Sequence, residues 1–291
     1  MDRGGADLHM HSRYSDGADS PATLVERAAQ CRLDAISLTD HDTIKGVAEA
    51  QAAGASVGIR VLTGAELSAD FMGHEVHLLA YGFDAADAHL LDLMQRSRDD
   101  RETRISRMID LLNQLKIPVT LEQVKKKAGK ASLGRPHLAD ALLDVRAVNT
   151  LQEAFDRFLN PGRPAYMARP QMPLEAVRRA TYAAGGVLVL AHPHHNLSSG
   201  NIRSLVKAGI DGLEVLHPKH KGAQRRELSA LAREAGVLMT GGTDFHGEGR
   251  GHARIGSIRI ATDVVDGIEG PAATRLVRKE PHPAASAVEK T

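Results

Sequence analysis

The sequence predicts an α/β fold in which short β-strands alternate with amphipathic helices. Three observations indicate this fold: β-rich runs recur along the chain, helical patterns separate several of them, and polar clusters follow the strand ends. The predicted strands are Ala6–His11, Ala35–Thr39, Arg60–Ser68, Glu75–Tyr81, Gly186–Ala191, Gly212–Leu216, Val237–Gly241 and Ile255–Ile260. Such alternation is typical of βαβ units, which build a parallel sheet or a barrel.

The helical segments between these strands carry apolar residues at helical spacing. They include Pro21–Cys31, Pro173–Ala184, Ile202–Lys207 and Ala223–Glu234. Ser20 followed by Pro21 supplies an N-cap and a proline at the first helical position, and Pro173 is expected to begin a helix in the same way.

The alternation stops between about residues 87 and 170, where a long charged helix is predicted over Ala88–Leu115. Further helical stretches follow it, with little β signal. We therefore expect residues 1–86 and 171–266 to form the main domain and residues 87–170 to form a small all-α insert. Residues 267–291 lack periodicity and are expected to be an irregular tail.

The charge and the aromatic content limit the classes of ligand. The formal net charge is +1, whereas proteins that track long nucleic acids are usually more basic. Trp is absent and only nine residues are Phe or Tyr, so stacking platforms for single strands are scarce. Small phosphorylated ligands remain compatible with this composition, because a few local arginines and metal ions can hold them.

The single cysteine, Cys31, excludes a disulfide framework and a metal cluster of several thiolates. No apolar run is long enough to span a bilayer. Chemically informative residues begin at Asp7, which leaves no room for a signal peptide. These features predict a cytoplasmic protein without membrane contact, and the sequence indicates no obligate protein partner.

Histidines and acidic residues cluster at the predicted strand ends. Residues two apart share a face of a strand, so Asp7, His9 and His11 are expected to lie together. The other clusters are Asp16 on a glycine turn, Asp40-His41-Asp42, Glu66 with His77, His192-Pro193-His194-His195 and Asp244-Phe245-His246. The carboxyl ends of parallel barrel strands converge on one face. Any one of these clusters could consist of side chains that are simply hydrogen-bonded or exposed to solvent. That explanation would have to apply independently to each cluster, so the whole set favours a shared functional site.

Ligands of the His, Asp and Glu types suit Mn²⁺, Zn²⁺ or Fe²⁺. The candidates outnumber the ligands of one ion, and two or three ions sharing a carboxylate could clamp a phosphoryl group. The sequence contains no GxxxxGK[ST] phosphate loop and no GxSxG elbow, which argues against P-loop NTPases and α/β-hydrolases.

The complete set of motifs resembles the PHP family, named for polymerase and histidinol phosphatase. The motifs are DLHMHSRYSDG, LTDHD, AHP and TDFH, with Glu66 and His77 between them, over about residues 6–260. The resemblance implies a distorted (β/α)7 TIM-like barrel that carries a trinuclear metal site. Mn²⁺ is the expected ion, with Zn²⁺ or Fe²⁺ as alternatives.

The resemblance also implies a role for each matching residue. The first metal would be held by His9, His11, Glu66 and Asp244. Glu66 would bridge to a second metal held by His77 and His192. The third would be held by Asp16, His41 and His246. The metals would activate water for attack on phosphorus. His194 is the candidate for protonating the leaving group or binding phosphate, unless it is a solvated loop histidine.

Within the family, residues 133–137 resemble the GRPH segment of a short subgroup with a helical insert. Arg135 of this segment would face the metals and hold a phosphate. The segment around Arg163 is a second candidate for the edge of the substrate pocket, but a structural role for Arg163 is equally expected. Members of this subgroup hydrolyse the 3′-phosphate of nucleoside 3′,5′-bisphosphates, and relatives trim short 5′-phosphorylated RNA from its 5′ end.

We therefore expect a phosphatase of nucleoside 3′,5′-bisphosphates, such as adenosine 3′,5′-bisphosphate, in which Arg135 and His194 bind substrate. A second hypothesis is a 5′-3′ exoribonuclease with an open groove. The arginines that would line such a groove are Arg163, Arg169, Arg178 and Arg179. A histidinol-phosphate-type phosphatase and a non-catalytic PHP module are the third and fourth hypotheses.

Overall fold

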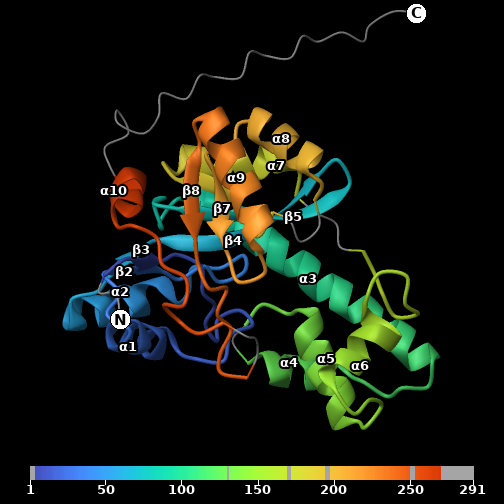
Figure 1. Cartoon of the computed structure of the whole chain (residues 1–291). Coiled ribbons are helices and arrows are strands. Elements are labelled where there is room, and N and C mark those ends of the chain that lie inside the picture. Colours follow the sequence, from blue (N-terminus) through green and yellow to red (C-terminus); the bar gives the residue numbers. More distant parts are fainter. Residues whose placement is uncertain (1–3, 130, 169–171, 194–196, 250–252, 270–291) are drawn as a thin grey trace, which may run out of the picture.

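A computed structural model describes residues 4–129, 131–168, 172–193, 197–249 and 253–269. Figure 1 shows a mixed α/β arrangement, which confirms the predicted fold class at that level. His194, Arg169 and most of the predicted tail lie outside the described residues. No described helix is both long enough and apolar enough to cross a membrane.

The first sheet has three parallel strands in the order β1-β2-β3. They are β1 (Ala6–Asp7), β2 (Ala35–Ser37) and β3 (Arg60–Leu62). Two crossover helices connect them, α1 (Pro21–Gln30) and α2 (Val47–Val57). The predicted N-cap of α1 is confirmed, because the Ser20 hydroxyl accepts a hydrogen bond from the Thr23 N–H at 3.1 Å.

The second sheet has five strands in sequence order. They are β4 (Gly64–Phe71), β5 (His74–Tyr81), β6 (Val187–Leu190), β7 (Gly212–Leu216) and β8 (Leu238–Gly241). The β4–β5 and β5–β6 pairs are antiparallel, and the pairs β6–β7 and β7–β8 are parallel. The remaining helices of this part are α7 (Leu174–Ala183), α8 (Ser199–Lys207) and α9 (Gly222–Ala235).

Two strand predictions are wrong in detail. The run Arg60–Ser68 is not one strand, since it divides at Thr63 into β3 and β4, which belong to different sheets. The run Ile255–Ile260 is not a strand, because the chain turns at Gly256 (φ 74°) and only Ile260 forms an antiparallel bridge to Ala6.

The expectation that the strands pair in parallel is wrong for β5, which is antiparallel to both β4 and β6 and forms a hairpin with β4. Phe71 pairs with His74, so the loop consists of Met72 and Gly73 alone. Both loop residues have positive φ, 55° and 79°, as a tight hairpin turn with the twist of its strands requires.

Isolated bridges connect the two sheets. Met10 pairs in parallel with Phe245, and His41 pairs in parallel with Glu66. The Leu8 N–H donates to the Gly241 carbonyl at 3.2 Å. Between the sheets lies an apolar cluster of Ala6, Leu8, Ala35, Leu62, Leu79, Tyr81, Val187, Val189, Ala191, Ile260, Val265 and Ile268. Within the described residues, the strand ladders therefore form two sheets joined by single bridges.

In the described residues between 88 and 159, all the regular elements are helices. They are α3 (Ala88–Gln114), α4 (Leu121–Ala128), α5 (Arg135–Asp144), α6 (Leu151–Ala154) and the π-helical turn η1 (Phe155–Leu159). Leu90 and Met94 in the first half of α3 join the core of the second sheet. Met108 and Leu112 in its second half pack with the shorter helices. Figure 1 shows α3 extending from the sheets to these helices.

A last helix, α10 (Asp263–Glu269), was not predicted and crosses the expected start of the tail at residue 267. Its apolar residues Val265 and Ile268 are fully buried in the cluster between the sheets. Arg60 of β3 forms ion pairs with Asp266 and Glu269, which fix the helix at the sheet edge.

Candidate metal centre

His9 and His11 follow β1 and are fully buried, with their Nε2 atoms 3.2 Å apart. Asp7 does not join them. Its carboxylate accepts hydrogen bonds from the N–H and hydroxyl of Thr243, at 2.9 and 2.7 Å, and so ties β1 to the segment after β8. Burial raises the pKa of Asp7 to about 6. The prediction that all three side chains lie together is therefore wrong for Asp7.

A first group of ligand atoms surrounds this histidine pair. It consists of Nε2 of His9, Nε2 of His11, Oε2 of Glu66 and Oδ1 of Asp244. Glu66 lies 3.3 and 3.1 Å from the two imidazoles, and Asp244 lies 3.4 and 3.3 Å from them. Burial alone lowers the pKa of His11, but its bonds to both carboxylates outweigh burial and raise that pKa to about 10.

The second oxygen of Glu66 faces a different pair of histidines. Oε1 lies 2.8 Å from Nδ1 of His77 and 3.1 Å from Nε2 of His192. Glu66 is only 1% exposed, so burial would raise its pKa. The surrounding histidines outweigh burial and hold the pKa of Glu66 well below its usual value. Its two oxygens thus contact two separate sets of imidazoles.

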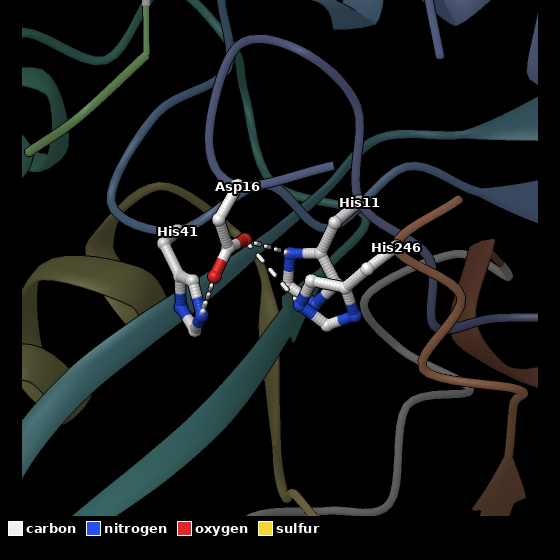
Figure 2. Close-up of side chains that lie close together, drawn as sticks. All are labelled: His11, Asp16, His41 and His246. Carbon is white, nitrogen blue, oxygen red and sulfur yellow. Dashed lines mark ion pairs between the residues drawn. The ribbon is translucent and has the colours of Figure 1, made fainter. Parts of the chain in front are cut away.

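A third group gathers around Asp16, as Figure 2 shows. Asp16 Oδ1 lies 3.3 Å from Nε2 of His246 and 3.6 Å from Nδ1 of His11. Its Oδ2 lies 3.7 Å from Nε2 of His41. The other nitrogen of His41, Nδ1, lies 3.3 Å from Glu66 Oε2, so this imidazole stands between two groups.

The donor set fits divalent metal ions. Four groups of at least three ligand atoms lie within 4.8 Å of one another. Nδ1 of His41 is buried and makes no hydrogen bond despite its nearness to Glu66. Burial lowers the pKa of His41 to about 3, so this imidazole is neutral and has one nitrogen lone pair that a cation would satisfy. Nitrogen and carboxylate oxygen ligands suit Mn²⁺, Zn²⁺ and Fe²⁺.

The backbone is strained at two of the candidate ligands. His192 has φ 31° and Asp244 has φ 50°, a region that non-glycine residues rarely adopt. Strain of this kind persists where the surrounding structure holds it, and it is concentrated at functional sites. Both residues follow strands, β6 and β8, so the strain arises where the chain turns its side chains toward the cluster.

Glu214 in β7 was not predicted from the sequence, although it supports the cluster directly. It is fully buried, its Oε1 lies 2.9 Å from Nδ1 of His9, and its Oε2 accepts the His192 N–H at 2.7 Å. His217, directly after β7, lies 3.3 Å from Asp244. The signal was present in the sequence, because an acid inside an apolar strand followed by a histidine is the pattern that identified the other clusters.

Asp40 is also a supporting residue. Its carboxylate accepts hydrogen bonds from the N–H and hydroxyl of Ser12, both at 2.7 Å, and from the hydroxyl of Ser15 at 2.6 Å. These bonds fix the turn that carries Asp16. The acid of the LTDHD motif therefore organises a neighbouring loop.

Two larger cavities flank the cluster, beside a smaller one of about 130 Å³ that His77, His192 and Arg135 line. The first has a volume of about 240 Å³ and is lined by His41, His77, Ser132 and the arginines Arg101, Arg104 and Arg135. The second has a volume of about 740 Å³ and is lined by Asp244, His246, His217, Lys219 and Lys221. Asp16 lines both cavities. The cluster therefore lies between an arginine-lined hollow and a larger hollow edged by lysines.

Of the predicted substrate contacts, Arg135 lines the first cavity, where its guanidinium donates a long hydrogen bond of 3.5 Å to the Leu159 carbonyl. Of the arginines suggested for an open RNA groove, the three that the structure describes lie elsewhere. Arg163 is exposed, Arg178 pairs with Glu175, and Arg179 lines a separate hollow beside α3.

Comparison with known proteins gives consistent results. The profile of the PHP domain matches residues 7–123. The chain is 34% identical over 245 residues to a 5′-3′ exoribonuclease of Haemophilus influenzae, covering 82% of this chain and 89% of that protein. It is 33% identical over 256 residues to a 3′,5′-nucleoside bisphosphate phosphatase of Chromobacterium violaceum, covering 86% and 90%.

A solved structure from Bifidobacterium adolescentis, described as a metal-dependent phosphoesterase, has a TM-score of 0.83 and 33% identity. The match covers 91% of this chain and 95% of that one. The similarity therefore extends over nearly the whole of each chain. On this evidence the chain belongs to the PHP family.

Proposed function

We propose that this protein is a metal-dependent phosphatase that removes the 3′-phosphate from nucleoside 3′,5′-bisphosphates, such as adenosine 3′,5′-bisphosphate, to give AMP and phosphate. The observation that carries the proposal is the position of the His and carboxylate cluster beside a cavity lined by Arg101, Arg104 and Arg135. The relative named as a 3′,5′-nucleoside bisphosphate phosphatase supports the same substrate class.

The proposed resident ions are two or three divalent metals, with Mn²⁺ first and Zn²⁺ or Fe²⁺ as alternatives. The first would be held by His9, His11, Glu66 and Asp244, the second by Glu66, His77 and His192, and the third by Asp16, His41 and His246. The distances around both Glu66 oxygens support a bridging role for this residue. Ions of this kind supply Lewis-acid activation of water and of the phosphoryl oxygens.

The protein's own side chains would orient the ligands and the substrate. Glu214 accepts a hydrogen bond from His9 and so directs the other imidazole nitrogen toward the cluster. Arg135 would bind the phosphate that does not react, because a guanidinium matches phosphate geometry. His194 is the proposed proton donor to the leaving 3′-oxygen, because it lies two residues beyond His192.

We further propose that the two sheets belong to one distorted (β/α)7 barrel built from residues 1–86 and 171–266. The bridges between Met10 and Phe245 and between His41 and Glu66 support this arrangement. The helices of residues 87–170 would form an insert over the barrel. The apolar cluster that contains Met108 and Leu112 is separate from the apolar clusters of the two sheets, which supports this arrangement. Residues 267–291 would be the tail, beginning within α10.

The second candidate function is 5′-3′ exoribonuclease activity on short 5′-phosphorylated RNA, which the relative from Haemophilus influenzae supports by name. The larger cavity favours it, because a downstream strand needs room on the side away from the arginines. Lys219 and Lys221 line this cavity, and Lys219 Nζ lies 3.7 Å from Asp244. In the bisphosphatase, by contrast, the arginine-lined cavity would hold most of the substrate.

Product analysis with Mn²⁺ tests these candidates. Adenosine 3′,5′-bisphosphate, a 5′-phosphorylated RNA and histidinol phosphate would be offered in parallel at equal concentration. Fast release of phosphate and AMP from the bisphosphate, with little mononucleotide from RNA, would support the proposal. Mononucleotide release from RNA at an equal or greater rate would replace it with the exoribonuclease.

The same experiment distinguishes two more activities. Hydrolysis of histidinol phosphate alone would assign a histidinol-phosphate-type phosphatase. No turnover and no bound metal would indicate a non-catalytic module. A Lys219→Ala/Lys221→Ala variant would slow RNA cleavage selectively if the larger cavity holds the strand. Lys126→Ala, an exposed lysine on α4, is the matched control.

A further inference from the structure

The third group of candidate ligands is held differently from the first. His9 and His11 of the first group are fully buried. The side chains of the third group are partly exposed, with values of 18% for Asp16, 14% for His41 and 23% for His246. Figure 2 shows Asp16 between His41 on one side and His246 on the other. The third group therefore depends less on core packing and more on how its loops contact one another.

Two loops supply most of this group, the Asp16 loop (residues 12–19) and the His246 loop (residues 242–249). They pack directly together, because the Ala18 N–H donates to the His246 carbonyl at 2.8 Å. Gly247 (φ 123°) permits this approach, since a Cβ atom there would lie 2.6 Å from Cβ of Ala18. His246 Nδ1 donates to the Asp244 carbonyl at 2.8 Å, so Nε2 is the nitrogen that faces Asp16.

Arg27, in the last turn of α1, forms ion pairs with both loops. Its Nε lies 2.9 Å from Oδ2 of Asp19, the last residue of the Asp16 loop. Its Nη1 donates to Oε1 of Glu248, in the His246 loop, at 2.6 Å. We call these three residues the Arg27 clamp. One guanidinium thus joins the two loops that carry Asp16 and His246.

We propose that Arg27 is a positioning residue for the third metal ion, because the clamp holds the Asp16 loop and the His246 loop together. The inference rests on the proposed metal ligands and adds a residue that lies outside them. An ion bound by Asp16, His41 and His246 needs ligands from separate loops. If the clamp orders these loops before the ion arrives, the free energy of ordering them does not reduce the affinity.

Charge alone predicts the opposite effect of the same residue. Arg27 is positive, and its removal would leave the carboxylates of Asp19 and Glu248 unbalanced. Added negative charge attracts a cation, so an arginine that acted only through its charge would weaken metal binding. Replacing it by methionine would then tighten binding of the third ion. Loss of the clamp predicts weaker binding, and the direction of the change therefore distinguishes the two explanations.

Titration calorimetry with Mn²⁺ on chelator-treated protein measures this direction. His246→Ala identifies the binding step of the third ion, because it removes a ligand of that ion alone. We expect Arg27→Met to raise the Kd of this step by about 3- to 30-fold, as the loss of two partly exposed ion pairs implies. Glu248→Gln removes one pair and should raise it by about 2- to 5-fold. The exposed Glu248 also keeps the test valid if Arg27→Met does not fold.

Arg60→Met is the matched control. Arg60 forms a similar double ion pair, with Asp266 and Glu269 of α10, and joins neither ligand loop. The control removes the same charge and should change the Kd of the third ion by less than about twofold. An Arg27→Met protein that binds this ion as tightly as Arg60→Met, or more tightly, would overturn the inference.

Hydrogen exchange separates the clamp from the proposed function, because it needs neither metal nor substrate. The Ala18 amide bonded to His246 should exchange about 3- to 30-fold faster in chelator-treated Arg27→Met than in the wild type or Arg60→Met. A wild type without the step that His246→Ala removes would refute the third ion of the proposed function, whereas faster Ala18 exchange would still support the clamp. An unchanged exchange rate of Ala18 in folded Arg27→Met would overturn the clamp itself.

Discussion

Replacing Glu214 by glutamine should weaken metal binding without removing any proposed ligand. Glu214 is ionised, because the charge of His9 outweighs the effect of burial and lowers the pKa of this carboxyl group. A carboxylate only accepts hydrogen bonds. The 2.9 Å contact therefore places the proton of His9 on Nδ1. Its Nε2, which faces Glu66 and Asp244, is then the nitrogen that would bind a metal ion, in exchange for the proton that these carboxylates favour there.

Glutamine has the same shape but cannot satisfy both contacts of Glu214. If its oxygen accepts the His192 N–H, its NH₂ group faces Nδ1 of His9 and favours the tautomer with the proton on Nε2. In the opposite orientation, its NH₂ group faces the N–H of His192. Loss of such an outer partner typically costs 10- to 100-fold in metal affinity, or about 1.4–2.7 kcal/mol.

Titration calorimetry with Mn²⁺ on chelator-treated protein measures this effect. Glu26→Gln, on the exposed face of α1, is the matched control and should bind as the wild type does. Circular dichroism would show that both variants are folded. A folded Glu214→Gln protein with wild-type affinity for Mn²⁺ would refute the inference that Glu214 orients His9.

Two further predictions concern packing and metal removal. A Cβ atom added at Gly242 would lie 2.4 Å from both Cβ and N of His9, so Gly242→Ala should lower the free energy of unfolding by about 1–3 kcal/mol. Denaturant unfolding checks this, with Gly267→Ala as the control, because that position has no atom within 4 Å and should change stability by less than about 1 kcal/mol. Metal at 100 times its Kd should add about 2.7 kcal/mol per site. A chelator should therefore lower the Tm by about 5 °C or more in thermal scans, and an unchanged Tm would contradict a metal-loaded native state.

The sequence predicted the cluster because its residues sit at positions that local geometry defines. His9 and His11 follow β1 two residues apart, and His192 and Asp244 follow strands whose apolar runs are easy to recognise. The alternation of strands and helices predicted the α/β class for the same reason. In each case the spacing of neighbouring residues carried the information.

The errors arose where distant contacts decide the structure. Asp7 has the spacing of a ligand, but its partner is Thr243, which lies 236 residues away in the chain. Residues 60–68 read as one β-rich run, and only tertiary pairing assigns its halves to different sheets. Arg104 has the sequence context of an ordinary charged helix residue, and its burial depends on Tyr166 and Met167.

The central carboxylate shows why site and fold depend on each other here. Glu66 of β4 contacts His9 and His11 beyond β1, His41 beyond β2, and His192 beyond β6. These segments belong to both sheets, which single bridges join in the described residues. Burying a carboxylate and several imidazoles gives little net stability, because desolvation offsets their attraction. The apolar clusters must therefore stabilise the fold, while Glu66 fixes how the strand ends of the two sheets face one another.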